Sequence, residues 1–204
     1  MDKSTRKIIS LMLIIIIIAS LILIYKINQK PKYDKELYLE VYSDYKEIFR
    51  EETNETNNTN QKEKIIQITN ASGQEYSVVG KISIPKIHIS YPVIYTTSEE
   101  YLKVAPTKLS GPEIGEVGNV SIVGHNYNNQ EFFSEIYKLI LGDYIYIYDI
   151  DKKQYNYAVY DRYEVNENDV SCLNQQTNGN REITLITCTN DDEKRLVVKA
   201  RQKL

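Results

Sequence analysis

The sequence has few cysteines, few histidines and no excess of positive charge, and each shortage excludes a class of protein. Its 204 residues contain 2 Cys, too few for the disulfide framework of a small secreted domain. A single disulfide between Cys172 and Cys188 remains an alternative, because the sequence alone does not report the distance between two thiols. The 2 His are scattered and lack the close ligand pair typical of zinc sites. A formal net charge of −3 also lacks the basic footprint of a nucleic-acid-binding protein.

Glycine and proline are scarce too, at 8 and 5 residues, whereas tyrosine is abundant, at 18. Together with many Ile and Val residues, this composition favours β-structure. A hydrophobic content of 42% is enough for a core, and the length leaves room for one globular domain after an N-terminal apolar segment.

The apolar segment, residues 8–25, contains no charged residue and includes an unbroken isoleucine run from Ile14 to Ile18. As a helix it reaches roughly 27 Å, close to the thickness of the bilayer hydrocarbon. A cleaved signal peptide is the alternative. The apolar run continues beyond Ala19 and Ser20, its only small residues, and this favours an uncleaved transmembrane anchor.

Around the anchor we expect a cytoplasmic tail over residues 1–7 and an extracellular remainder. Lys3, Arg6 and Lys7 lie in the shorter flank, which favours a cytoplasmic N-terminus. Residues 26–72 are expected to hold a stalk helix over Tyr33–Arg50, where apolar residues recur every three or four positions, and a polar linker over Glu51–Lys64.

The folded domain is predicted to begin near Gly73 and to run to residue 204. Turn residues separate short strand-like segments, and two short helices are expected at Ser98–Val104 and Gln130–Leu141. Many short strands with few helices predict an all-β fold, a closed barrel or a sandwich. The expected strands are Tyr76–Ile84, His88–Ile94, Val117–Gly124, Asp143–Asp149, Gln154–Val165, Ile183–Cys188 and Arg195–Ala200.

A candidate site lies near the C-terminus. Cys188 ends an apolar, β-branched run, and Arg195 follows after a polar turn, so a hairpin would place the two opposite each other on one face. His125 ends an upstream strand. A thiol to attack, an imidazole to move protons and a fixed cation to hold negative charge are the parts of a nucleophilic site. Taken singly, Cys188 as a buried apolar residue and Arg195 as a solvated strand charge are the commoner interpretations.

The other His and Cys are interpreted as structural. His88 has no neighbouring nucleophile, and Cys172 lacks an adjacent basic residue, so we expect Cys172 to pack against apolar side chains.

Thr184-Leu185-Ile186-Thr187-Cys188 resembles the Thr-Leu-x-Thr-Cys signature of the sortase family. Gly118–His125 looks like the family's His strand, and Thr184–Arg195 like its Cys and Arg strands. The resemblance extends over most of the domain, through Gly80–Pro85, Tyr91–Ile94 and Phe132–Ile136. It implies a closed eight-stranded sortase-type β-barrel with short helices, preceded by the transmembrane helix.

The resemblance also implies an activity on the outer face of a Gram-positive cell. Such enzymes cut a Leu-Pro-x-Thr-Gly-like sorting signal between Thr and Gly, hold the acyl group as a thioester, and pass it to an amine of peptidoglycan or a pilin. By position, Cys188 is the nucleophile and His125 the general acid, then base. Arg195 stabilises the oxyanion or positions the substrate, and Thr187 assists beside the nucleophile. No cofactor and no nucleic-acid partner are expected.

Within the family the chain resembles class D or class A, because it lacks the Asp-Pro lid motif of pilin-polymerising members. Some class A members bind calcium through loop acids, but we interpret the acids here as solvated charge and predict no metal. The acids in question are Glu113, Glu116, Glu164, Glu167 and Asp169. A thiol protease and a non-catalytic wall-binding module remain as alternatives.

Overall fold

The computed structural model describes residues 9, 12–22, 65–69, 73–190 and 193–203. The predicted tail (1–7), stalk helix (33–50) and linker (51–64) lie outside these described residues. The chain separates into two compact units, Met1–Lys32 and Tyr33–Leu204, which are described in turn.

In the first unit, residues 12–22 form an α-helix within the predicted anchor. Its large apolar side chains are exposed, from 50% at Ile14 to 62% at Ile16. The Ser20 hydroxyl donates a hydrogen bond to the Ile17 carbonyl over 2.7 Å, which satisfies the polar group within the helix. Among the described residues, none of the helices combines the length and the apolar character needed to cross a bilayer.

The second unit is built on strands. They are β1 (Ile66–Thr69), β2 (Glu75–Ile84), β3 (Ile89–Ile94), β4 (Thr107–Ser110), β5 (Gly118–Val123), β6 (Tyr144–Asp149), β7 (Gln154–Asn166), β8 (Arg181–Cys188) and β9 (Lys194–Gln202). Short helical elements connect them: η1 (Pro85–Ile87), α3 (Glu99–Leu102), η2 (Ile136–Lys138) and η3 (Ser171–Leu173).

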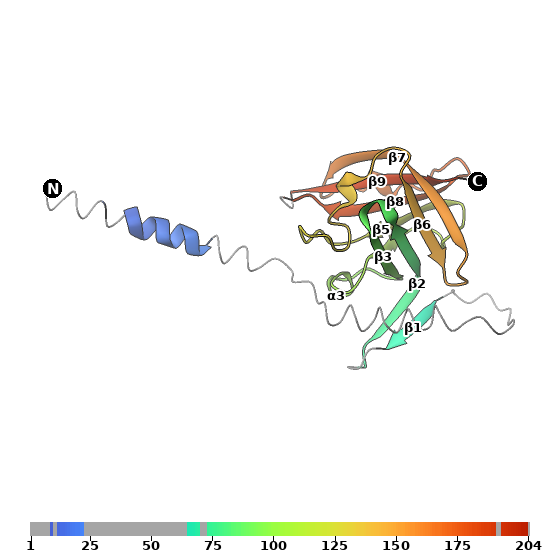
Figure 1. The fold of residues 1–204 in the computed structure, drawn as a ribbon, viewed down its shortest axis with the longest axis horizontal. Coiled ribbons are helices and arrows are strands. Elements are labelled where there is room, and N and C mark those ends of the chain that lie inside the picture. Colours follow the sequence, from blue (N-terminus) through green and yellow to red (C-terminus); the bar gives the residue numbers. More distant parts are fainter. Residues whose placement is uncertain (1–8, 10–11, 23–64, 70–72, 191–192, 204) are drawn as a thin grey trace. The chain divides into compact units, whose positions relative to one another are not determined.

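The strands form one sheet in the order β1-β2-β3-β4-β5-β8-β9-β7-β6, and β2 also pairs with β6. This last pairing closes the strands β2 to β9 into an eight-stranded barrel (Figure 1). The predicted closed barrel is therefore confirmed, and the sandwich alternative is wrong. The sheet also includes β1, which pairs with Glu75–Val78 and lies before Gly73, where the domain was predicted to begin.

Gly80 allows the barrel to close. It lies in β2 where the strand changes partner, from β1 to β6. A Cβ at Gly80 would come 2.2 Å from the Tyr148 carbonyl oxygen, so any larger residue would push β6 away. The seam between the first and last parts of the barrel therefore depends on glycine at this position.

The interior is filled by aliphatic side chains that alternate with outward ones. In β6, Ile145 and Ile147 are 0% and 1% exposed, whereas Tyr144 and Tyr146 lie on the other face with stacked rings 6.2 Å apart. This alternation is the period of a half-buried strand. The strand predicted over Asp143–Asp149 is confirmed as β6.

Most predicted strands appear, with two differences. The predicted strand His88–Ile94 begins at Ile89, because His88 has a left-handed conformation (φ 56°) and ends η1 with a bond from its N–H to the Pro85 carbonyl. β4 was not predicted. It has only four residues and one register pair with β3, too short for a period of two to be recognised.

The predicted helix over Ser98–Val104 is confirmed as α3, whose N-terminus is capped by the Ser98 hydroxyl accepting from the Tyr101 N–H. The predicted helix over Gln130–Leu141 is wrong, since only the short η2 forms there.

The local backbone conformation explains the missing helix. The Asn129 amide oxygen accepts from the Glu131 N–H, and the Ser134 hydroxyl accepts from the Tyr127 N–H. Phe132 adopts a positive φ of 47° and donates its N–H to the Tyr91 hydroxyl. A positive φ is incompatible with a right-handed helix, so no helix runs through Phe132.

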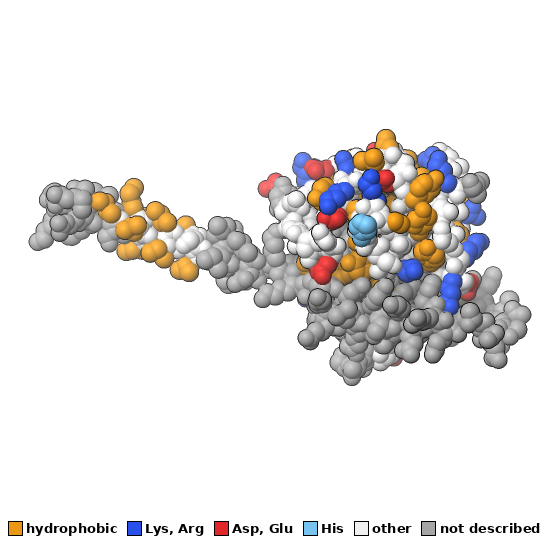
Figure 2. Space-filling view, in the orientation of Figure 1, with side chains coloured by type: hydrophobic (Ala, Val, Ile, Leu, Met, Phe, Trp, Pro, Cys, Tyr) orange, Lys and Arg blue, Asp and Glu red, His pale blue; other side chains and the backbone are white. Residues whose placement is uncertain are grey.

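On the face of the domain shown in Figure 2, basic and acidic side chains are interspersed among apolar ones. This face therefore carries no extended patch of one sign, in keeping with the small net charge of the chain.

Candidate active site

The β8–β9 hairpin places Cys188 directly opposite Arg195 in an antiparallel register. The turn between them is closed by the Thr189 N–H, which donates to the Lys194 carbonyl over 3.0 Å, and by the Thr189 hydroxyl, which bonds the same residue. Because side chains of directly opposed residues share a face, the thiol and the guanidinium lie on one side of the sheet. The predicted pairing of Cys188 with Arg195 is confirmed.

Parallel pairing brings His125 to the same edge. The β5–β8 ladder ends with Val123 opposite Ile186, and His125 and Cys188 each lie two residues beyond that pair. The Gly124 N–H still donates to the Ile186 carbonyl over 3.1 Å, so the backbone next to His125 is held against β8. Thus two residues 63 positions apart in the chain emerge side by side.

His125 is held in place from the side opposite β8. Its carbonyl accepts the Phe133 N–H over 3.1 Å, and its ring packs against Tyr127 with the ring centroids 5.1 Å apart. A Cβ at Gly124 would come 2.9 Å from the Phe133 ring, so glycine lets this ring approach the backbone beside the imidazole.

Cys188, His125 and Arg195 line one cavity of about 320 Å³, which we call the Cys188 groove. Cys188 is half-buried and forms no disulfide. The groove is mostly apolar, with its floor on β5 and β8 and its walls on α3, β4 and the loop that follows β7. Its apolar lining includes Leu102, Leu109, Val123, Val165, Leu173 and Ile186.

The Arg195 guanidinium forms an ion pair across this groove. Its Nη2 lies 2.6 Å from an oxygen of Glu167, which belongs to the loop after β7. The Arg195 side chain is 24% exposed and that of Glu167 is 63% exposed. The guanidinium is therefore at the groove but bound to a solvated carboxylate.

Thr187 lies on the other side of the strand from the thiol. It is buried, and its hydroxyl donates to the Gly124 carbonyl over 2.7 Å. This bond ties the end of β8 to the residue before His125. The hydroxyl thus holds the backbone next to His125, and Thr187 lines the Cys188 groove together with Cys188, so its assistance beside the nucleophile stays a prediction.

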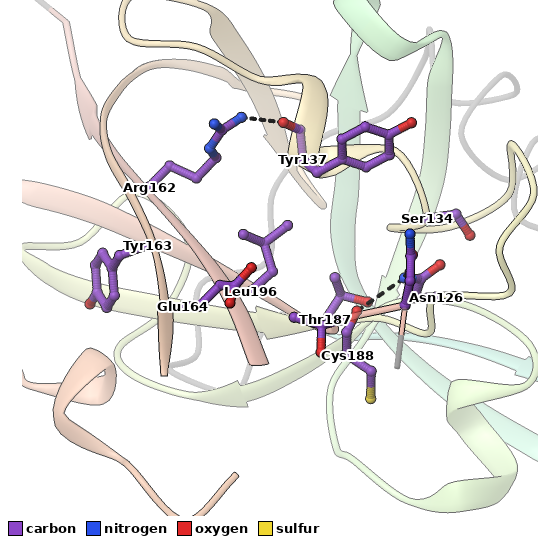
Figure 3. A pocket seen from close by; sticks show the side chains of 11 residues that line it. Asn126, Ser134, Tyr137, Arg162, Tyr163, Glu164, Thr187, Cys188 and Leu196 are labelled. Atoms are coloured by element: carbon purple, nitrogen blue, oxygen red, sulfur yellow. Dashed lines mark hydrogen bonds between the residues drawn. The ribbon is translucent and has the colours of Figure 1, made fainter. Parts of the chain in front are cut away.

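Asn126 is a site residue that the sequence prediction missed. Its side-chain amide donates to the Cys188 carbonyl over 3.1 Å and to the Asn190 side chain over 3.0 Å (Figure 3). The only sequence signal was a polar residue directly after His125. The bond fixes the backbone of Cys188 against the His loop.

A second, more polar cavity of about 430 Å³ lies behind Cys188, where the thiol points away from Tyr137 and Arg162 (Figure 3). Arg162 donates from Nη1 to the carbonyls of Tyr137 and Leu139, the latter over 2.9 Å. It therefore holds the loop containing η2 over β7.

Cys172 packs as predicted. It is 3% exposed, contacts Ile186 and Val197, and is a free thiol, so the alternative bridge to Cys188 is not formed. Burial raises the pKa of the Cys172 thiol, which keeps it protonated and unreactive.

The acidic residues considered for calcium are engaged with protein groups. Glu113 pairs with Lys108 over 3.0 Å, and Glu164 lies 3.5 Å from Lys194. Asp169 accepts hydrogen bonds from Ser171, which lower the pKa of its carboxyl. Glu167 is the partner of Arg195. Among the described residues, no cluster of His, Cys, Asp and Glu has the arrangement of a metal site.

Several known proteins resemble this chain. Sortase A of Bacillus anthracis is 34% identical over 137 residues, which is 66% of this chain and 64% of that protein, less than two thirds of its length. Listeria monocytogenes sortase A matches in structure with a TM-score of 0.57 and 28% identity, over 62% of this chain and 88% of the other. A Clostridium perfringens sortase D5 transpeptidase gives 0.57 and 29%, over 62% and 79%.

The family model described as the sortase domain matches residues 82–203, which include His125, Cys188 and Arg195. That match covers more than half of the chain, and with these relatives it establishes that the chain belongs to the sortase family.

Proposed function

We propose that this chain is a cysteine transpeptidase that cleaves a Leu-Pro-x-Thr-Gly-like sorting signal between Thr and Gly. It would transfer the acyl group to an amine of peptidoglycan or of a pilin. The observation that carries the proposal is the meeting of Cys188, His125 and Arg195 in one groove of a sortase domain. Its partners are then surface proteins that bear the signal.

In the proposed reaction the Cys188 sulfur attacks the threonine carbonyl carbon, and a tetrahedral oxyanion forms. The C–N bond to glycine breaks, His125 gives its proton to the leaving amine, and a thioester remains on Cys188. The incoming amine then attacks the same carbon. His125 takes its proton, and the thiolate leaves as the new amide forms.

Arg195 is proposed to stabilise the oxyanion or to position the substrate. To do so its guanidinium has to exchange Glu167 for the substrate. An ion pair this exposed contributes only about 0–1 kcal/mol, so the exchange costs little. The planar fork of the Arg195 guanidinium can also hold two oxygens at once.

The groove favours an apolar residue of the signal. Leu109, Val123 and Ile186 present aliphatic surface in the same groove as the thiol. Burying a leucine side chain in such a site is worth about 1.5–3 kcal/mol, enough to orient an extended peptide along β8. Class D or class A remains the proposed subclass.

Residues 8–25 are proposed to anchor the enzyme in the cell membrane, with the N-terminus in the cytoplasm and the catalytic domain outside. The uncharged sequence of this segment supports the proposal, as do the helix over residues 12–22 and its exposed apolar side chains. A signal that attaches proteins to the wall also requires an enzyme on the outer face.

For the anchor, we expect protease treatment of intact Gram-positive protoplasts to release the catalytic domain while residues 1–25 stay in the membrane fraction. Immunoblotting with tags at both ends measures this distribution. A mature N-terminus directly after Ala19 or Ser20, found by N-terminal sequencing, would show a cleaved signal peptide instead.

For the site, we expect Cys188→Ala to abolish peptide cleavage, because the covalent route is lost. Arg195→Lys should lower kcat/KM by roughly 10²-fold or more, because an ammonium does not reproduce the fork. Cys172→Ala is the matched control and should keep most of the activity. Rates come from a fluorescence-quenched sorting peptide, with thermal unfolding to confirm folding. Equal losses in both Cys variants, with both folded, would contradict the assignment.

The fate of the thioester separates a transpeptidase from a thiol protease, which is the principal alternative. Water is present at roughly 55 M. An amine at millimolar concentration therefore reacts with the thioester faster than water does only if the enzyme orients the amine, and such orientation can supply effective molarities of about 10⁵ M or more. We expect an added peptide amine to yield mainly ligated product, with slow hydrolysis in its absence. Mass spectrometry during an acceptor titration measures both products. Fast hydrolysis that no candidate amine diverts would leave the protease as the function.

A further inference from the structure

Gln175 lies in the loop between β7 and β8. Its side-chain amide is hydrogen-bonded to the backbone of β5, in the way that a neighbouring strand would be. Its Oε1 accepts the Asn119 N–H over 3.0 Å, and its Nε2 donates to the Asn119 carbonyl over 2.9 Å. The pairing of β4 with β5 ends at Ser110 opposite Ser121. The amide of Gln175 therefore satisfies both backbone groups of Asn119 beyond the end of β4.

The Asn119 side chain is also hydrogen-bonded to this loop. Its Nδ2 donates to the carbonyls of Cys172 (2.9 Å) and Asn174 (3.2 Å), and its Oδ1 accepts the Thr184 hydroxyl over 2.7 Å. Asn119 and Thr184 are both fully buried. Every polar group of this amide is thus used to join β5, β8 and the loop, and breaking one bond would leave a buried group unsatisfied.

The loop that these bonds hold, residues 171–175, forms a wall between two cavities. On one side, Cys172 and Leu173 line the Cys188 groove. On the other side, Leu173 and Gln175 line a separate, open cavity of about 460 Å³ next to Pro112 and Val117. Leu173 packs against Cys172, Ile186 and Val197 on the groove side, and its carbonyl accepts the Gln175 Nε2 over 2.9 Å. The cavity on the other side supplies no packing, so the hydrogen bonds of Gln175 hold the loop from that side.

We propose that Asn119 and Gln175 are positioning residues that determine which apolar side chain the groove selects. They hold Leu173 beside Ile186 and Val123, and these three side chains line the part of the groove that takes the aliphatic residue of the sorting signal. This inference rests on the proposed function. Neither residue touches the thiol or the imidazole, so the chemistry at Cys188 is unaffected by a change in the wall.

The test compares Gln175→Ala with Gln176→Ala, which removes the neighbouring exposed amide of the same loop. Both are made in the full chain in detergent micelles and assayed with peptides that carry Leu or Ala at the apolar position of the signal. We expect Gln175→Ala to raise KM for the Leu peptide on the order of 10-fold with kcat nearly unchanged, and to reduce the Leu-over-Ala preference toward unity. Gln176→Ala should match the wild type.

Two further measurements separate positioning from loss of structure. Both variants should remain folded at the assay temperature in thermal unfolding, and the rate of Cys188 alkylation by iodoacetamide should be the same in both. Amide hydrogen exchange over residues 171–175 should be faster in Gln175→Ala alone. This last measurement does not need activity, so it tests the wall even if the wild type cleaves no sorting peptide and the proposed function fails.

The inference is overturned if Gln175→Ala keeps the wild-type KM and Leu-over-Ala ratio, whether or not exchange is faster. Equal exchange over residues 171–175 in the two variants would also overturn it, because the wall would then be held by something other than Gln175. A drop in kcat with an unchanged KM would assign Gln175 to the chemistry and not to selection.

Discussion

Parallel pairing between β5 and β8, from Gly118 opposite Arg181 to Val123 opposite Ile186, carries His125 and Cys188 to the same edge of the barrel. The antiparallel hairpin to β9 then adds Arg195. Side chains alternate along a strand, so a slip of one residue in β8 would turn the Cys188 thiol into the barrel and away from the groove. The register of β8 is therefore the constraint on which the site depends.

The barrel holds that register. Ile183 and Leu185, the residues of β8 that face inward, are 1% and 0% exposed and belong to the main core, so a slip would remove them from that core and put Thr184 and Ile186 in their place. The closing contact between β2 and β6 removes the free edges around this core. At the end of β8, side-chain bonds from Thr187 and Asn126 continue the attachment beyond the last strand pair.

The floor and the outer wall of the Cys188 groove are held by different kinds of hydrogen bond. Its floor consists of strands with a full set of backbone bonds, whereas its outer wall is a loop attached through Asn119 and Gln175. Arg195 reaches that same loop through Glu167. A rigid floor preserves the geometry of thiol and imidazole, and a separately attached wall lets recognition vary without disturbing them.

The sequence predicted the parts of the fold that have a strong local pattern. The alternation in Tyr144–Asp149 and the apolar run before Cys188 were sufficient for β6 and β8, and the turn length was sufficient for the pairing with Arg195. β4 escaped prediction because a four-residue strand has no measurable period.

Long-range hydrogen bonds were also beyond prediction. The helix expected over Gln130–Leu141 is interrupted at Phe132, whose positive φ accompanies a bond from its N–H to the Tyr91 hydroxyl, 41 residues away. The contacts of Asn126 and of Asn119 join residues more than 50 positions apart. An isolated Asn gives no sign of such a partner in the sequence.

The central claim is that Cys188, held beside His125 by the β5–β8 pairing, is the residue whose sulfur carries the acyl group. It is tested most directly by mixing the enzyme with a Leu-Pro-x-Thr-Gly-type peptide, quenching with acid within one turnover, and locating the adduct by mass spectrometry after digestion at low pH. We predict an added Leu-Pro-x-Thr acyl group on Cys188 that disappears when an amine is supplied. Peptide cleavage with no adduct, or with the adduct on Cys172, would contradict it.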